Sequence, residues 1–178
     1  VQLCALEPAA PWSVLAVTFT NKAAGELRDR LSAFGIRGAE SVWAMTFHSA
    51  CVRILRRDID RLGFSKDFTI YDTDDSKRVL KDIVRELELD EKAFPPRELL
   101  SEISNAKDAM ETAQDYARRW SGSGDWRRER IAKAYARYVQ QLAEANALDF
   151  DDIILHTVTL LQREPDVRDY YRNKFRYV

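Results

Sequence analysis

Val14-Leu-Ala-Val-Thr-Phe-Thr-Asn-Lys-Ala-Ala24 is the stretch of sequence that decides the fold. Its first half is a short apolar run after Pro11, and such a run is typical of a buried strand in a parallel sheet. Thr20 or Asn21 can then cap a helix that ends at Gly35. The stretch therefore predicts a strand that turns directly into a helix, which is the basic unit of an α/β fold.

The same order of elements is repeated further along the chain. Ser41-Val-Trp-Ala-Met-Thr46 predicts a second strand, and a helix from about His48 to Gly63 follows it. Phe68-Thr-Ile-Tyr71 predicts a third short strand. Because strand and helix alternate in this way, we expect residues 1–71 to form the first part of an α/β domain.

From Asp72 onward the pattern changes to helices. Asp72 or Thr73 can cap one helix, Pro95-Pro96 opens another, and a long helix is expected from about Trp126 to Asn146. These helices predict a helical insertion over residues 72–148. Insertions of this size often carry contacts with a substrate, because they lie at the rim of a rigid scaffold.

The chain is then expected to return to the α/β part over residues 149–178. Asp149 can cap a further helix, and Phe175-Arg-Tyr-Val178 looks like the first half of a strand. The sequence starts at a valine and stops inside this apolar run, as is expected of a piece excised from a longer protein.

Composition places the chain among soluble globular proteins. Hydrophobic residues make up 46% and charged residues 32% of the 178 residues, which excludes disorder as a whole. There is no apolar run of the roughly 18 residues that a membrane span needs, and we expect a cytoplasmic protein. Cys4 and Cys51 lack the spacing of a zinc site or a disulfide framework, so both are expected to be reduced. With a net charge of -1, only local basic patches could indicate nucleic acid.

Polar side chains follow the first two predicted strands where each strand ends. The carboxyl ends of adjacent parallel strands meet at one edge of a sheet, where open α/β folds bind ligands. Aromatic rings and hydroxyl groups along such an edge suit a groove that follows a single nucleic-acid strand. The alternative is that Phe19 is a core residue and that the hydroxyl groups only cap helices. The candidate residues are Thr18, Phe19, Thr20 and Asn21 after the first strand, and Thr46, His48 and Ser49 after the second.

These segments resemble motifs of the UvrD-like group of superfamily-one DNA helicases. Residues 14–24 resemble motif Ia, and Thr46-Phe-His-Ser49 with the residues after it resembles the next DNA-contacting motif. Residues 147–154 resemble the segment before the Walker B strand, and residues 175–178 resemble its opening. The resemblance implies a partial RecA-like (P-loop NTPase) parallel sheet, divided by an all-helical subdomain over residues 72–148 and cut before Walker B.

The resemblance also implies a function. Such helicases use ATP and Mg²⁺ to move on single-stranded DNA, generally 3′ to 5′, and unwind duplex in repair or replication. By this resemblance the residues at the first strand end contact single-stranded DNA, with Phe19 stacking on a base, and those at the second contact its backbone. The helical subdomain would lie near the duplex, where Arg127, Arg128, Arg130 and Lys133 are candidate phosphate contacts. The alternative for these four is a solvated helix face.

The sequence departs from the family pattern in its nucleotide-binding motifs. None of its six glycines belongs to a G-x-x-x-x-G-K-[ST] loop, and its one Asp-Glu pair, Asp90-Glu91, follows a charged helical stretch. We therefore expect no bound ATP or Mg²⁺, no catalytic residue and no ATP hydrolysis by these residues alone. Asp149, Asp151 and Asp152 are expected to favour a helix N-terminus, and no metal site is assigned.

Two further expectations concern partners and rival functions. The partners expected are single-stranded and duplex DNA, together with possible self-association through unpaired sheet edges. A motor-less module that binds single strands or another protein is the alternative function. Salt-dependent binding to oligonucleotides would separate a DNA-binding chain from a protein-interaction domain.

Overall fold

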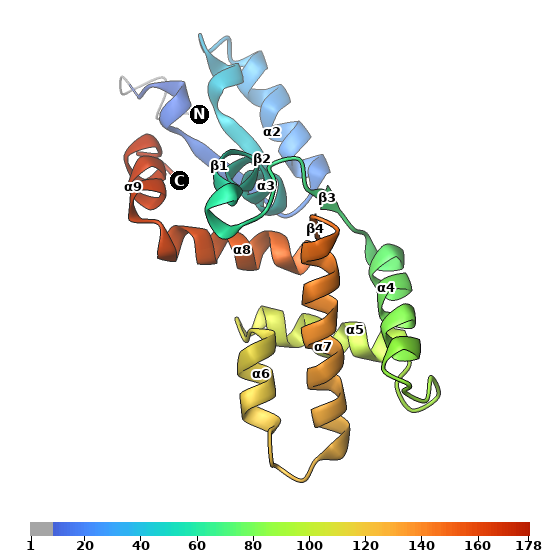
Figure 1. The fold of residues 1–178 in the computed structure, drawn as a ribbon. Helices are drawn as coiled ribbons and strands as arrows, with labels where there is room; N and C mark the ends of the chain where they lie inside the picture. Colours follow the sequence, from blue (N-terminus) through green and yellow to red (C-terminus); the bar gives the residue numbers. More distant parts are fainter. Residues whose placement is uncertain (1–8) are drawn as a thin grey trace. The chain divides into compact units, whose positions relative to one another are not determined.

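A computed structural model describes residues 9–178, which are predominantly helical and contain two small parallel sheets (Figure 1). The chain divides into two compact units, one with residues up to 62 together with 157–178, and the other with residues 63–156. Cys4 lies outside the described residues. Within residues 9–178, no helix combines the length and the apolar character that a membrane crossing needs.

The first unit holds the longer of the two sheets. Its strands are β1 (Leu15–Thr18) and β2 (Trp43–Thr46). Its α-helices are α2 (Asn21–Ala33), α3 (Phe47–Asp58) and α9 (Pro165–Lys174). Its short 3-10 helices are η1 (Pro11–Ser13), η2 (Ala39–Ser41) and η3 (Ile59–Leu62). The second unit contains β3 (Thr69–Ile70), α4 (Thr73–Glu86), α5 (Pro96–Asp108), α6 (Ala113–Trp120), α7 (Trp126–Glu144) and β4 (Ala147–Leu148). Helix α8 (Phe150–Arg163) begins in the second unit and ends in the first.

Strands β1 and β2 lie side by side and run parallel (Figure 1). Their register pairs Leu15 with Trp43 and Thr18 with Thr46. On the other side of β1, the Leu15 amide donates to the carbonyl of Tyr177 at 2.9 Å, so the last residues run along β1 as the start of a strand. The two strand–helix units expected from the sequence are therefore present.

Both faces of this sheet are covered, because successive strand residues point to opposite sides. On one face, Val42 and Ala44 pack with Leu31 of α2 in a buried cluster. On the other face, the buried Trp43 ring lies edge-on to Phe175, with ring centroids 4.8 Å apart. A strand that is apolar on both faces suits a layered α/β arrangement.

The second unit is a helical body closed by a short pair of strands. Helices α6 and α7 form a hairpin that packs with α4 and α5 around a shared apolar core (Figure 1). Residues 68–71, expected as a third strand of the α/β layer, do contribute β3, but β3 pairs in parallel with β4 in a separate sheet. The Asn146 side chain reinforces this closure by accepting the Ser65 amide at 2.9 Å.

A buried cluster of charged groups joins α5 to the start of α8. Lys107 is 2% exposed, and its ammonium lies 2.7 Å from a carboxylate oxygen of both Asp149 and Asp152. The Tyr138 hydroxyl donates to Asp149 at 2.9 Å. Asp149 also accepts the Asp152 amide at 2.8 Å, and Asp152 accepts the Asp149 amide at 3.3 Å. The expected cap at Asp149 is thus present, but it forms part of a larger buried network.

One ammonium serves two carboxylates in this cluster, so the two acids differ in their pKa. Burial alone would raise the pKa of Asp149, but the Lys107 charge and hydrogen bonds hold it below its ordinary value. Burial raises the pKa of Asp152 to about 6, against the attraction of Lys107, and the Asp149 charge adds to the rise. The single Lys107 ammonium therefore compensates the negative charge of Asp149 more fully than that of Asp152.

Removal of Lys107 should strongly destabilise the second unit. We expect Lys107→Met to lower the free energy of unfolding by about 3–5 kcal/mol, because it leaves two buried carboxylates without their counter-charge. Adding Asp149→Asn and Asp152→Asn should recover most of this loss, since amide side chains can still accept the capping amides. Urea denaturation followed by circular dichroism measures both changes. Equal stabilities of the single and triple variants would contradict the role of charge compensation.

The cluster should also leave a pH signature. Between about pH 4 and 6 the folded chain keeps a proton on Asp152 that the unfolded chain has released, so the stabilisation from this group is lost as the pH rises through about 6. Asp152→Asn removes that loss. We expect the variant to gain stability relative to the parent by about 1–3 kcal/mol between about pH 4 and pH 7. A difference in unfolding free energy that stays constant over this range would contradict the raised pKa.

Candidate nucleic-acid interface

The ends of β1 and β2 bring two aromatic rings together at one edge of the sheet. Thr18 and Thr46 are register partners, and the residues that follow them are Phe19 and Phe47. The Phe19 side chain is 91% exposed and its ring centroid lies 5.5 Å from that of Phe47. The alternative that Phe19 belongs to the core is therefore excluded.

The threonine hydroxyl groups at this edge shape the two turns. The Thr20 hydroxyl accepts the Ala23 amide at 3.2 Å and so caps α2. The Thr18 hydroxyl donates to the carbonyl of Thr20 at 3.0 Å. A hydroxyl group has one proton to donate. The Thr18 proton is used within the turn, whereas the Thr20 hydroxyl accepts a hydrogen bond there and can still donate its own proton.

The second strand end is built in the same way. The largely buried Thr46 hydroxyl accepts the Ser49 amide at 3.2 Å and lies 2.8 Å from the Ser49 hydroxyl. His48 and Ser49 are exposed on the first turn of α3. Helices α2 and α3 thus begin beside each other, and helix N-termini favour negatively charged groups such as phosphates.

The structure therefore brings the seven strand-end candidates to one edge. Thr18 to Asn21 follow β1, and Thr46, His48 and Ser49 follow its neighbour β2. The sequence placed the aromatic residue Phe47 in the same cluster, but Phe47 was not among the seven candidate DNA contacts. The edge offers an exposed aromatic surface flanked by neutral hydrogen-bond donors.

The basic stretch on α7 is partly neutralised inside the second unit. Arg127 donates to the carbonyl of Ala93 and lies 3.0 Å from Glu98. Arg128 pairs with Glu102, and it also donates to the Tyr116 hydroxyl at 3.0 Å. Its guanidinium lies 5.1 Å from the centre of the Trp120 ring. Two of the four candidate phosphate contacts thus hold α7 to α5 and α6.

The other two basic candidates are available at the surface. Arg130 and Lys133 are exposed, and within residues 9–178 neither makes an ion pair. Trp126, at the start of α7, is 63% exposed and contacts Phe94 edge-on. The four candidates on this helix therefore fall into a structural pair and a solvent-facing pair.

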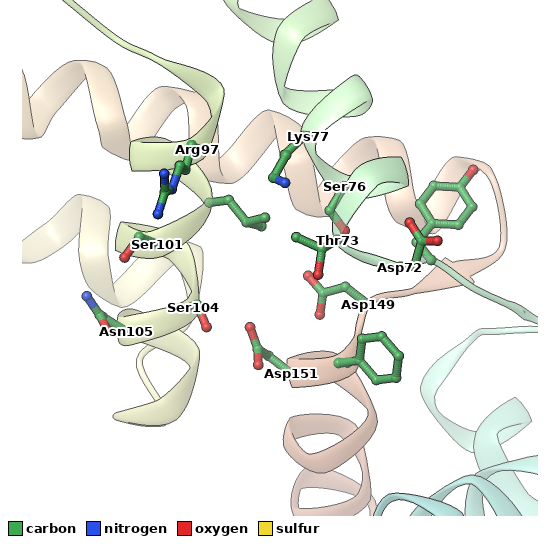
Figure 2. A pocket seen from close by; sticks show the side chains of 13 residues that line it. Asp72, Thr73, Ser76, Lys77, Arg97, Ser101, Ser104, Asn105, Asp149 and Asp151 are labelled. Atoms are coloured by element: carbon green, nitrogen blue, oxygen red, sulfur yellow. The ribbon is translucent and has the colours of Figure 1, made fainter.

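A polar pocket of about 530 Å³ opens in the second unit among α4, α5 and the start of α8. Figure 2 shows Ser104 of α5 and Asp151 of α8 pointing into this space, with Ser76 and Lys77 of α4 nearby. Asp149 lines the pocket and is paired with Lys107 on its buried side.

The pocket has no strong preference for one sign of charge. Its lining carries the cations Lys77 and Arg97 and the acids Asp72, Asp149 and Asp151. Within the described residues, no three His, Cys, Asp or Glu side chains come together as a metal-binding group. Asp149 and Asp152 contact Lys107 and bond to each other's amides at the helix start, and Asp151 lines the pocket.

Lys107 is the residue that sequence reasoning missed in this unit. It lies four residues after Ile103 on α5, so helical spacing places it on the same face as that buried residue. A lysine on an apolar face is a signal of a buried counter-charge. The identity of its partners could not be read from the sequence, since they lie 42 and 45 positions further along the chain.

Comparison with known proteins identifies the family of this chain. The family model of the UvrD/REP helicase N-terminal domain matches residues 1–178. The ATP-dependent DNA helicase PcrA of Staphylococcus aureus (strain Mu50) is 45% identical over 168 residues, which is 94% of this chain and 23% of that protein. The protein of the same name from Bacillus subtilis (strain 168) is 43% identical over 176 residues, covering 99% of this chain and 23% of the relative.

The chain belongs to the UvrD/REP helicase N-terminal domain family. It spans about a quarter of the length of the curated relatives it matches. The resemblance found in the sequence motifs is thereby confirmed for the family.

Substitution on α7 should distinguish the structural arginine from the solvent-facing one. We expect Arg128→Ala to lower the free energy of unfolding by about 1–2 kcal/mol, because it removes a cation–π contact and charge-assisted hydrogen bonds. Arg130→Ala should change it by less than about 0.5 kcal/mol. Urea denaturation of the two variants gives the comparison. Equal losses in both variants would contradict the division into a structural pair and a solvent-facing pair.

Proposed function

We propose that this chain carries the single-strand-binding edge of the RecA-like motor domain of a DNA helicase. In this proposal residues 1–71 begin the motor domain, residues 72–148 form its helical insertion, and residues 149–178 return to it. The observation that carries the proposal is the exposed Phe19 ring at the shared edge of β1 and β2, beside the start of two helices. Within the described residues Phe19 is almost fully exposed, which leaves most of its ring available to a base.

Each group at this edge has a proposed role. Phe19 stacks on a base, and because every base has a flat face that can stack on an aromatic ring, this contact does not depend on the DNA sequence. Thr20, Asn21, His48 and Ser49 donate hydrogen bonds to backbone phosphates, together with the amides at the helix starts. Thr18 and Thr46 contact the single-stranded DNA from the two turns that they shape.

The whole protein is proposed to be an ATP-dependent DNA helicase. It would use ATP and Mg²⁺ to translocate on single-stranded DNA, 3′ to 5′, and to unwind duplex in repair or replication in the cytoplasm. The printed name of the relatives, ATP-dependent DNA helicase, supports this proposal. Since these 178 residues lack a G-x-x-x-x-G-K-[ST] loop, we propose that ATP is bound by other parts of the protein.

The helical insertion is proposed to approach the duplex through Arg130 and Lys133. Their charges are exposed, and each phosphate contact with duplex would contribute about −0.9 to the slope of log affinity against log salt. Arg127 and Arg128 can join them only by giving up their contacts within the unit. We therefore rank the exposed pair first among the four.

Self-association is proposed for the outer edge of β2. Within the described residues, β2 pairs with no strand other than β1, and at its other edge the Ala44 carbonyl accepts a hydrogen bond from the Arg28 side chain at 3.0 Å. Sedimentation velocity over a range of concentrations tests this, and a constant monomer would contradict it.

Replacement of Phe19 tests the proposed function directly. We expect Phe19→Ala to weaken binding of the chain to a fluorescein-labelled oligothymidylate by about tenfold or more, because stacking on one base is lost. Fluorescence anisotropy titrations at two salt concentrations measure the affinity and its salt dependence. The matched control is Phe34→Ala, since Phe34 is also exposed, at 66%, but follows the far end of α2. Unchanged affinity in Phe19→Ala, or equal losses in both variants, would overturn the proposal.

A further inference from the structure

Phe47 is an exposed aromatic residue for which the proposed DNA contacts have so far given no role. Its side chain is 44% exposed, and it is the first residue of α3. The capping bond between the Thr46 hydroxyl and the Ser49 amide fixes the backbone at this point. The backbone of Phe47 is therefore held in place, although part of its ring faces solvent.

The register of the sheet brings the Phe47 ring against Phe19. Thr18 and Thr46 are opposite each other in the sheet, and Phe19 and Phe47 are the residues that directly follow them. The ring planes are tilted by 39° and the centroids are 5.5 Å apart, within the range of favourable aromatic pairs. This contact links two turns that are 28 residues apart in the sequence.

The spacing of the two rings excludes one way of binding a base. A base held between two aromatic rings needs about 3.5 Å on each side, or about 7 Å between the rings. The centroids are closer than this, so a base cannot enter between the rings as they stand. A base can only stack on the outer face of the pair.

Phe19 also needs support if it is to bind a base efficiently. A ring that is 91% exposed makes few contacts of its own, and an unsupported side chain moves among several rotamers. Binding would then have to fix the rotamer, which costs conformational entropy and weakens the affinity. Contact with an ordered neighbouring ring lowers this cost before DNA arrives.

We propose that Phe47 is a positioning residue that holds the Phe19 ring in the orientation that stacks on a base of single-stranded DNA. This inference rests on the proposed function, because it requires Phe19 to contact DNA. Phe47 acts through Phe19 and makes no stacking contact itself. Loss of Phe47 therefore matters only while Phe19 is present.

A double-mutant cycle tests this dependence. We expect Phe47→Ala to weaken binding to the labelled oligothymidylate about threefold to tenfold, and Phe47→Tyr, which keeps the ring, to bind as the parent does. In a chain that already carries Phe19→Ala, the further change Phe47→Ala should have no effect. Phe34→Ala again serves as the control for loss of an exposed phenylalanine. Thermal melting checks that every variant is folded, and Phe47→Leu replaces Phe47→Ala if the alanine variant is not.

The outcomes separate the inference from the proposed function. If Phe19→Ala weakens binding but Phe47→Ala does not, the positioning role is wrong and the proposed function stands. If Phe47→Ala weakens binding equally with and without Phe19, Phe47 acts on DNA or on the fold independently, and the inference is again wrong. If Phe19→Ala leaves the affinity unchanged, the proposed function itself fails. Non-additive losses with rescue by tyrosine support the inference.

Discussion

The parallel register of β1 and β2 is the constraint on which the candidate interface depends. It places Thr18 opposite Thr46, and every feature of the edge follows from that pairing. Because parallel strands end on the same side of a sheet, the turns after them and the two helix starts must lie together. A slip of one residue would move each side chain to the other face, and the two rings would no longer meet.

The second unit depends on a constraint of another kind, the compensation of buried charge. Lys107 is sealed inside the unit, and an ammonium is stable there only with carboxylates in direct contact. The two acids that supply this contact also cap the start of α8 through each other's amides. The same side chains therefore fix a helix terminus, and Asp149 also lines the polar pocket.

Local signals in the sequence predicted much of this arrangement. The apolar run after Pro11, the capping threonines and Pro96 at the first position of α5 each indicated an element that the structure contains. They could do so because strand periodicity and helix capping depend on neighbouring residues. The pairing of β3 with β4 was not predicted, since two residues per strand leave no periodic pattern and the partners are 78 positions apart. Likewise, the acidic partners of Arg127 and Arg128 come from another helix, so a basic run alone could not show that two of its charges are engaged.

The sequence by itself determined the order of strands and helices, the residues that cap them and, through its motifs, the helicase family. Those properties are local, or are carried by short contiguous segments that keep their meaning wherever the chain folds. Only the tertiary structure decided that Phe19 is exposed and meets Phe47, and that Lys107 lies between Asp149 and Asp152. Exposure and charge pairing are set by which distant segments pack together, and that choice depends on the free energy of the whole fold.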